Sequence, residues 1–290
     1  MKQTTYTINV NGTLMDLSTP RVMGIVNVTP DSFFAGSRTQ TEADIARRVE
    51  QLLTEGADIL DLGGYSSRSG AADVSPAEEC ERLRLGLSVI RRVCPDAVVS
   101  VDTFRADVAR MCVEEYGAAI INDISGGELD AGMFPTVARL GVPYILMHMQ
   151  GTPQTMQDKP RYDDLLRDVF LYFARKVQQL RDLGQKDIIL DPGFGLGFGK
   201  TLEDNYTLLA HLEEFASVFQ LPVLVGVSRK SMVTKLLGIT PAEALNGTTV
   251  LNTLCLTKGA AILRVHDVRP AVEAVRLVQA MQSPALTIHH

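Results

Sequence analysis

Arg264 and His266 stand two residues apart at the end of an apolar run. Side chains two apart on a strand point to the same face, so this cation and this imidazole can bind one anionic group together. Asp102 and Asp191 each follow another short apolar run, and Lys230 follows a third. Carboxylates accept hydrogen bonds and ammonium groups donate them, which suits the edges of a polar, planar ligand. These residue types indicate a site for such a ligand and for a separate anion.

Polar residues of this kind follow every strand-like run of the chain. Short apolar runs with β-branched residues, which predict strands, occupy residues 21–28, 58–62, 97–101, 119–121, 142–147, 187–190, 222–227 and 260–265. One polar end means little by itself, because Asp, Asn and Ser often cap the helix that follows. All of these ends together predict carboxylates, amides and cations around one rim.

Amphipathic segments lie between the runs. Apolar residues recur at three- and four-residue spacing, as in helices packed on one face, at residues 41–55, 76–93, 105–116 and 162–183. Ser75 and Thr240 each precede a proline and stand three residues before a glutamate, which predicts capped helix starts. Alternating strands and helices without a linker predict an α/β fold with a single TIM-type (β/α)8 barrel, whose active site lies at the carboxyl ends of the strands.

The chain is expected to form one barrel with short appendages. We expect residues 1–19 to form a short strand or hairpin that closes the barrel floor, residues 20–284 to form the barrel, and residues 285–290 to form a C-terminal tail. His289 and His290 in that tail are either native or the remainder of a purification tag. They carry no functional argument.

The bulk composition excludes several classes of function. The net charge of -6 and the pI of about 5.4 leave no broad basic surface for nucleic acid or an anionic membrane. The chain has no apolar stretch of membrane-spanning length and no signal core at its start, which predicts a cytoplasmic protein. The four cysteines form no CxxC pair, so a zinc site is not expected.

Seven motifs, in order along the chain, resemble those of the dihydropteroate synthases, a family of pterin-binding TIM barrels. They are MGIVNVTPDSF at 23–33, SVDT at 100–103, NDI at 122–124, LMHMQGTPQTMQ at 146–157, LDPGFG at 190–195, SRKSM at 228–232 and RVHDV at 264–268. The resemblance implies a transferase of folate biosynthesis that joins 6-hydroxymethyl-7,8-dihydropterin diphosphate to p-aminobenzoate. Dihydropteroate and diphosphate would be the products. It also implies Mg²⁺ as cofactor and a homodimer.

The same resemblance implies roles for particular residues. The pterin would be held by Asp102, Asn122, Asp191 and Lys230. The diphosphate would be bound by Arg264 and His266, with Asn27 as a ligand of Mg²⁺ and Ser67 in contact with the substrate. The groups expected to take part in catalysis are Asp102, Lys230, Arg264 and His266.

The second substrate is expected to bind at the first two loops of the barrel mouth. In the family pattern p-aminobenzoate would lie beside Phe33, Arg68, Ser69 and Ser231. Asp31 and Arg68 belong to the loops that fold over the site in the family. No nucleophilic side chain is required, because the amine of p-aminobenzoate attacks the carbon that the diphosphate leaves.

The sequence departs from the family at two places near this expected site. Many relatives carry Glu, Thr and Pro where this chain has Tyr65, Ser67 and Ser69, and loss of the proline frees the backbone. The string DPGFGLGFGK is about two residues longer than the family pattern, and the extra pair aligns as Gly-Leu or as Gly-Phe. We hypothesise reduced sulfonamide sensitivity. The alternative is a tolerated insertion without consequence, because lengthening a loop costs little free energy.

Three other functions compete with this interpretation. A pterin-barrel methyltransferase would share the pterin pocket but would have no use for Arg264 and His266 as a diphosphate site. A binding-only relative would lack a reactive group, whereas Asn27, Asp102 and Lys230 are all present. A phosphate-binding aldolase barrel would need a suitably placed Schiff-base lysine, and none stands out in the sequence. Release of diphosphate that depends on p-aminobenzoate separates all of them.

Overall fold

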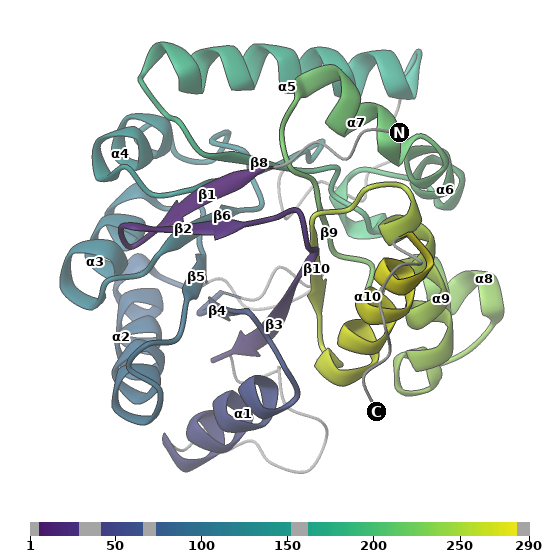
Figure 1. Ribbon diagram of the computed structural model, residues 1–290. Coiled ribbons are helices and arrows are strands. Elements are labelled where there is room, and N and C mark those ends of the chain that lie inside the picture. The colour runs from purple at the N-terminus through teal and green to yellow at the C-terminus, as the bar shows by residue number, and fades with distance from the viewer. Residues whose placement is uncertain (1–5, 29–41, 66–73, 152–161, 283–290) are drawn as a thin grey trace.

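The computed structural model describes residues 6–28, 42–65, 74–151 and 162–282, and in these residues helices surround a sheet of parallel strands (Figure 1). The strands are β3 (Arg21–Asn27), β4 (Ile59–Gly63), β5 (Val99–Asp102), β6 (Ile120–Asp123), β7 (Tyr144–Met147), β8 (Ile188–Asp191), β9 (Leu224–Val225) and β10 (Ile262–Val265). Their spatial order is β8-β7-β6-β5-β4-β3-β10-β9, and a parallel bridge between Leu190 and Val223 joins the two edges. The expected TIM-type α/β barrel is confirmed.

The helices follow the strands and form the outer layer. They are α1 (Glu42–Thr54), α2 (Pro76–Val93), α3 (Ala106–Tyr116), α4 (Met133–Leu140), α5 (Leu165–Asp182), α6 (Leu202–Ala210), α7 (Leu212–Phe219), α8 (Ser231–Leu237), α9 (Leu245–Thr257) and α10 (Val268–Gln282). The four helices named from the sequence are α1, α2, α3 and α5. The largest difference in bounds is at α5, which begins at Leu165 rather than at residue 162.

One of the two expected helix starts begins a 3-10 turn and not an α-helix. Ser75 accepts a hydrogen bond from the backbone of Glu78 at 3.2 Å and begins α2, as expected. Thr240 forms a capping box with Glu243, but it begins only the short 3-10 turn η2 (Pro241–Glu243), and the α-helix starts later, at Leu245. Arg229 Nη1 donates to the carbonyls of Pro241 and Ala242, which draws these two acceptors toward the guanidinium.

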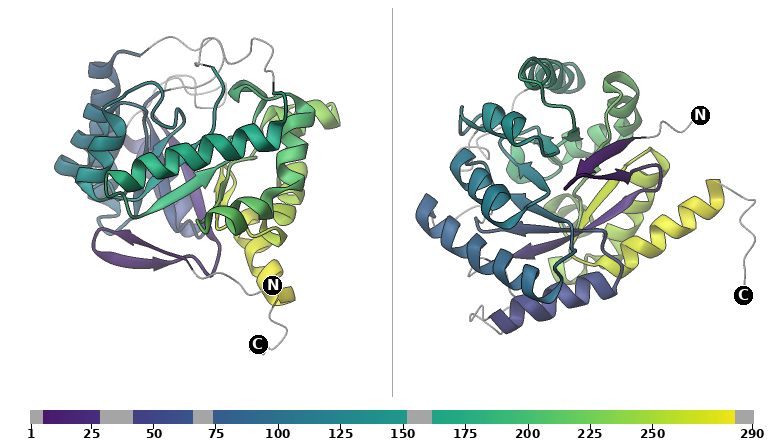
Figure 2. Two further views of the ribbon diagram at one scale, coloured as in Figure 1. Left: turned by 90° about the horizontal axis from the view of Figure 1, so that it is seen from above. Right: turned by 60° about the vertical axis from the view of Figure 1, so that its left-hand side comes forward.

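The chain begins with an antiparallel hairpin, β1 (Thr7–Val10) and β2 (Thr13–Asp16). Asn11 and Gly12 in its turn both have positive φ, at 50° and 83°, the conformation that favours Asn-Gly in tight hairpins. Figure 2 shows the hairpin at one end of the barrel. The expected hairpin at the floor is confirmed. The domain bounds at residues 19/20 and 284/285 stay a prediction, because residues 283–290 lie outside the described chain.

The interior of the barrel is layered because alternate residues of a strand point to the same face. The floor cluster combines hairpin and strand residues, namely Ile8, Val10, Leu17, Met23, Ile59, Ala119, Ile120, Ile145, Ile189, Leu224, Ala261 and Ile262. Two residues further along their strands come polar partners in the pairs Ile59 and Asp61, Ile120 and Asn122, Ile189 and Asp191, and Ile262 and Arg264. The apolar floor therefore supports a polar layer at the carboxyl ends.

No helix among the described residues has the length and apolarity needed to span a membrane.

Candidate active site

Arg264 lies at the centre of the polar layer and joins two acidic strand ends. Its Nε donates to Asp61 Oδ2 at 2.6 Å and its Nη2 donates to Asp102 Oδ2 at 2.8 Å. Asn122 donates to the same oxygen of Asp61 at 3.1 Å. Asp61 is fully buried, and its other oxygen, Oδ1, has no hydrogen-bond partner among the described residues. The predicted site residues Arg264 and Asp102 therefore pair directly, and Asn122 joins them through Asp61, a carboxylate that was not expected from the sequence to belong to the site.

The charges of this cluster depend on burial. Burial, opposed by the attraction of Arg264 and aided by the nearby Asp61, raises the pKa of Asp102 to about 7. Burial alone would lower the pKa of Arg264, but the attraction of Asp61 and Asp102 outweighs it and the pKa is raised. The guanidinium therefore stays charged.

Two lysines, the buried Lys200 and the half-buried Lys230, lie near Asp191 at the end of β8. Lys230 Nζ donates to the carbonyl of Phe194 and lies 4.8 Å from the centre of the Phe198 ring. Lys200, which is 1% exposed, donates from Nζ to the carbonyl of His148 at 3.0 Å. Asp191 Oδ1 accepts from the backbone of Gly193 at 2.7 Å. The carboxylate is thus oriented by its own turn.

The ionisation of these three groups is mutually dependent. Burial lowers the pKa of Lys230 to about 8 and that of Lys200 to about 7, and the attraction of Asp191 opposes both changes. Burial raises the pKa of Asp191, and Lys230 is the largest opposing influence. An ionised Asp191 offers acceptors, and a protonated Lys230 offers donors.

His266 is held by Ser228, which follows β9. The Ser228 hydroxyl oxygen accepts from the backbone N–H of His266 at 3.1 Å and lies 3.0 Å from the ring Nδ1. The single proton of that hydroxyl is then directed to Nδ1, which leaves the ring proton on Nε2. Burial, followed by the charge of Arg264, lowers the pKa of His266 to about 4. His266 is therefore a neutral Nε2–H donor at pH 7.

This lowered pKa predicts how stability depends on pH. Unfolded His266 binds a proton below its ordinary pKa of about 6.5, whereas the folded residue does so only below about 4. Its contribution to stability is therefore complete above pH 6.5 and is lost as the pH falls toward 4. Relative to His266→Gln, the parent should lose up to about 1.4 kcal/mol of unfolding free energy per pH unit in this window. Denaturant titrations at several pH values measure the difference, and parallel curves would contradict the assignment.

Asn27 and Ser231 occupy separate parts of the rim. Asn27 ends β3, and an ideal Cβ atom built on Gly63 would lie 3.3 Å from Asn27 Oδ1 and 3.6 Å from the Cβ of Asp102. The missing side chain of Gly63 therefore leaves space between these two polar groups. Ser231 is the first residue of α8, directly after Lys230.

Five predicted site residues lie outside the described residues, namely Asp31, Phe33, Ser67, Arg68 and Ser69. Their assignments stay predictions. Tyr65 and Val74, which flank residues 66–73, belong to the described residues.

The longer loop after β8 contains the 3-10 turn η1 (Leu196–Phe198). Phe198 packs on the cluster of Ile124, Met147 and Met149 and carries Lys230 over its ring. Because Phe198 is tied to the barrel in this way, the geometry favours the Gly-Leu alignment of the extra pair, which is equivalent to an insertion of Leu196 and Gly197.

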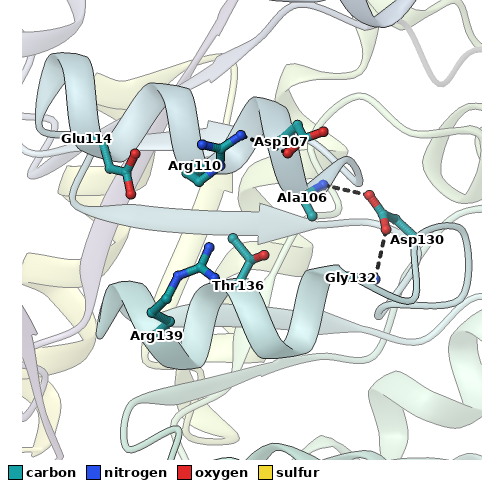
Figure 3. A pocket seen from close by; sticks show the side chains of 8 residues that line it. All are labelled: Ala106, Asp107, Arg110, Glu114, Asp130, Gly132, Thr136 and Arg139. Atoms are coloured by element: carbon teal, nitrogen blue, oxygen red, sulfur yellow. Dashed lines mark hydrogen bonds and ion pairs between the residues drawn. The ribbon is translucent and has the colours of Figure 1, made fainter.

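A hollow lies away from this layer, between α3 and α4 (Figure 3). Its volume is about 590 Å³, and its lining residues include Arg110, Glu114 and Arg139. Arg110 pairs with Asp107, and Asp130 accepts from the backbone of Ala106 at the start of α3. The lining mixes both signs of charge on the outer helical layer, and none of the predicted site residues belongs to it.

Comparisons with known proteins agree with this geometry. A family model described as pterin binding enzyme matches residues 23–266. The dihydropteroate synthase of Escherichia coli K12 is 44% identical over 276 residues, which cover 94% of this chain and 95% of the relative. The chain belongs to the dihydropteroate synthase family. It is therefore a transferase of folate biosynthesis.

Solved structures of the dihydropteroate synthase family share the whole fold. The Yersinia pestis enzyme in a sulfonamide drug complex has a TM-score of 0.89 and 40% identity, and the match covers 96% of this chain and 100% of that one. The Xanthomonas albilineans enzyme with 4-aminobenzoic acid has a TM-score of 0.86 and 39% identity, with 97% and 99% covered. The barrel is thus that of the dihydropteroate synthases.

Sequence reasoning missed three residues of the layer. Asp61 could have been found, because it stands two residues after Ile59 and so shares its inward face. Ser228 opens the SRKSM motif, but only the fold shows that it touches His266. Lys200 gave no signal, since a lysine after a glycine-rich run is usually exposed.

Proposed function

We propose that this chain condenses 6-hydroxymethyl-7,8-dihydropterin diphosphate with p-aminobenzoate to give 7,8-dihydropteroate. The observation that carries the proposal is the arrangement of Arg264 between Asp61 and Asp102, with Asp191 and Lys230 in the same layer. It offers acceptors and donors for a pterin and a cation for its diphosphate. The 4-aminobenzoic acid in the Xanthomonas albilineans structure supports the choice of second substrate.

The pterin is held by complementary edges. Asp191 accepts from the amino-pyrimidine edge, while Asn122 and Lys230 meet the remaining ring polar atoms, including the carbonyl. Asp102 faces the dihydropyrazine ring. Arg264, which pairs with Asp102, would then bring the anion site beside the reacting end of the ring.

The reaction is a displacement of diphosphate at the pterin methylene carbon. As the C–O bond breaks, its electron pair leaves with the diphosphate, whose charge Arg264 and the Nε2–H of His266 stabilise. The pterinyl cation is offset by Asp102. The amine of p-aminobenzoate then forms the C–N bond and releases a proton to solvent.

The donor set around Asn27 fits Mg²⁺ in one particular way. Mg²⁺ prefers oxygen ligands and often keeps waters and substrate phosphates in its shell. Asn27 offers an amide oxygen beside the space left by Gly63, whereas no group of three acidic, histidine or cysteine residues that could hold a metal occurs in the described part of the chain. Mg²⁺ would therefore be held by Asn27 and mainly by diphosphate and water. When bound, it supplies positive charge to the leaving group.

The second substrate is assigned to the loop side of the mouth. We assign p-aminobenzoate to Phe33, Arg68, Ser69 and Ser231, substrate contact to Ser67, and loop closure to Asp31 and Arg68. The support is the family pattern together with the position of Ser231 next to Lys230.

The test is diphosphate release measured with and without p-aminobenzoate. We expect release that depends on both substrates and falls about 100-fold or more when divalent metal is chelated, because a metal stabilises the leaving charge by several kcal/mol. Release without p-aminobenzoate would refute the condensation. Binding of both substrates without release would instead favour the binding-only function, and unchanged turnover after chelation would refute the metal role alone.

The longer loop leads to a prediction about sulfonamides, which imitate p-aminobenzoate with a bulkier sulfonyl group. Deleting Leu196 and Gly197 should lower the sulfonamide inhibition constant about tenfold or more relative to the KM of p-aminobenzoate, since shape discrimination of this kind contributes about 1–3 kcal/mol. The comparison variant lacks Gly197 and Phe198. It removes the ring beside Lys230, so it should also impair use of the substrate. An unchanged ratio in a folded, active Leu196–Gly197 deletion would support the tolerated insertion.

We also propose a cytoplasmic homodimer. The net charge of -6 suits an enzyme that is not bound to nucleic acid or to an anionic membrane. For the dimer, α8 and α9 expose the apolar side chains of Leu236, Leu237 and Leu254. Sedimentation equilibrium should give twice the chain mass, and a monomer at micromolar concentration would contradict the dimer.

A further inference from the structure

Arg229 lies in the turn between β9 and α8 and has a backbone conformation that is unusual for its residue type. Its φ is 56°, and the backbone N–H of Lys230 donates to the carbonyl of Val227 at 3.3 Å, so Arg229 is the third residue of the turn at 227–230. Gly or Asn usually takes that position when φ is positive, because a Cβ atom there crowds the following carbonyl oxygen. Such a conformation persists only where surrounding contacts hold it.

The side chain of Arg229 supplies those contacts. Its Nε and Nη2 donate to the two carboxylate oxygens of Asp267 at 2.8 and 2.9 Å. Its Nη1 donates to the carbonyl of Pro241 at 2.8 Å, and its backbone N–H donates to the hydroxyl of the buried Thr248 at 3.0 Å. Two parallel bonds between a guanidinium and a carboxylate fix their relative orientation. The turn is therefore held from its side chain and from its backbone.

The residues on either side of Arg229 belong to the polar layer. Ser228 accepts from the backbone N–H of His266 and lies 3.0 Å from its ring Nδ1. Lys230, on the other side, is assigned to the pterin. Because Asp267 directly follows His266, its pairing with Arg229 joins the segment after β9 to the segment after β10. One ion pair thus fixes a residue of the pterin site relative to one of the diphosphate site.

We propose that Arg229 is a positioning residue, which holds this turn and so aims Lys230 at the pterin and Ser228 at His266. The inference rests on the proposed function, which assigns Lys230 to the pterin and His266 to the diphosphate. The guanidinium of Arg229 is bound by Asp267 and by main-chain carbonyls, so it acts through its neighbours and not by contact with substrate.

Three variants separate this role from general stability. Arg229→Ala removes the guanidinium and keeps a Cβ atom at the positive φ, whereas Arg229→Gly removes the guanidinium and relieves the crowding. Asp267→Asn weakens the same pairing from its other side. The matched control is Arg91→Ala, because Arg91 likewise binds main-chain carbonyls, among them that of Tyr116 at 2.9 Å, but does so at the floor end of the barrel.

The measurements are the urea midpoint of unfolding, the calorimetric Kd of free pterin, and kcat. Arg229→Gly should unfold at a higher midpoint than Arg229→Ala, yet both should bind free pterin about tenfold more weakly and lower kcat about 100-fold, as for a displaced site group. Asp267→Asn should change Kd and kcat in the same direction by smaller factors. The control should lower the midpoint while Kd and kcat stay within about twofold of the parent.

Two outcomes would overturn the inference. One is a Kd and a kcat within about twofold of the parent in the folded members of the three test variants. The other is recovery of Kd and kcat together with the midpoint in Arg229→Gly, because the site would then respond to stability alone. Absence of p-aminobenzoate-dependent turnover in the parent would instead refute the proposed function. Since all variants are compared with an active parent, the two failures are distinguishable.

Discussion

Replacing Asp191 by alanine is expected to weaken binding of the free pterin about 100-fold or more. The carboxylate is buried at the end of β8 and is oriented by the backbone N–H of Gly193. If it accepts hydrogen bonds from the pterin edge, its removal leaves donors of the ligand without a partner in a buried site. Loss of one partner of a buried, charged hydrogen-bonded pair typically costs about 2–5 kcal/mol. Isothermal titration with a free pterin measures the change directly.

The matched control for this substitution is Asp187→Ala. Asp187 comes directly before β8, at the opposite end of the strand, and accepts from the backbone of Asn9 in the floor hairpin. It should change pterin affinity by less than about twofold, as surface substitutions do. Equal losses in the two variants would show that Asp191 acts through the stability of the strand and not through the ligand.

Arg264→Lys is expected to lower kcat about 100- to 1,000-fold, the loss typical of removing one group that stabilises a developing charge. A lysine keeps the charge, but it lacks the planar fork that now spans Asp61 and Asp102. The anion-binding charge would then be displaced. Because Arg264 also holds Asp102, some loss of pterin affinity should accompany the loss of turnover. Steady-state kinetics and pterin titration on the same variant separate the two effects.

Arg21→Lys provides the control for the geometry of the fork. Arg21 begins β3, donates to Asp58 at 3.0 Å and to the carbonyl of Asp16 at 2.9 Å, and so joins neighbouring elements at the floor. Because Arg21 lies at the floor, Arg21→Lys should leave kcat unchanged even where it lowers the free energy of unfolding. A kcat in Arg264→Lys within threefold of the parent (roughly 0.6 kcal/mol) would contradict the assigned role.

Sequence patterns predicted the barrel because each strand and helix carries its own periodicity. The strand ends were less well predicted. The expected run at 119–121 extends to Asp123, and β5 and β8 include Asp102 and Asp191, because backbone pairing continues past the last apolar residue. In contrast, the expected run at 222–227 pairs as a strand only at Leu224–Val225.

The site was predictable as a set of residue types but not as a set of contacts. Arg264 and Asp102 were both expected at the mouth, yet they come from strands far apart in sequence, and their ion pair depends on the spatial order β5-β4-β3-β10. Burial of Lys200 depends on the path of a glycine-rich turn in which Gly193, Gly195 and Gly199 all have positive φ. Local propensity does not specify such a path, so its chemistry was not visible in the sequence.

The short pairing between β8 and β9 has a consequence for hydrogen exchange. Leu190 donates to the carbonyl of Pro222 at 2.9 Å and bridges Val223, whereas the other neighbouring strands share longer ladders. Amides at this seam should exchange with solvent earlier than those of β3 or β4, because few bonds must break. Asp191 ends β8 and Lys230 follows β9, so a pterin bound between them would slow this exchange. The substrate would then act as the final tie that closes the barrel.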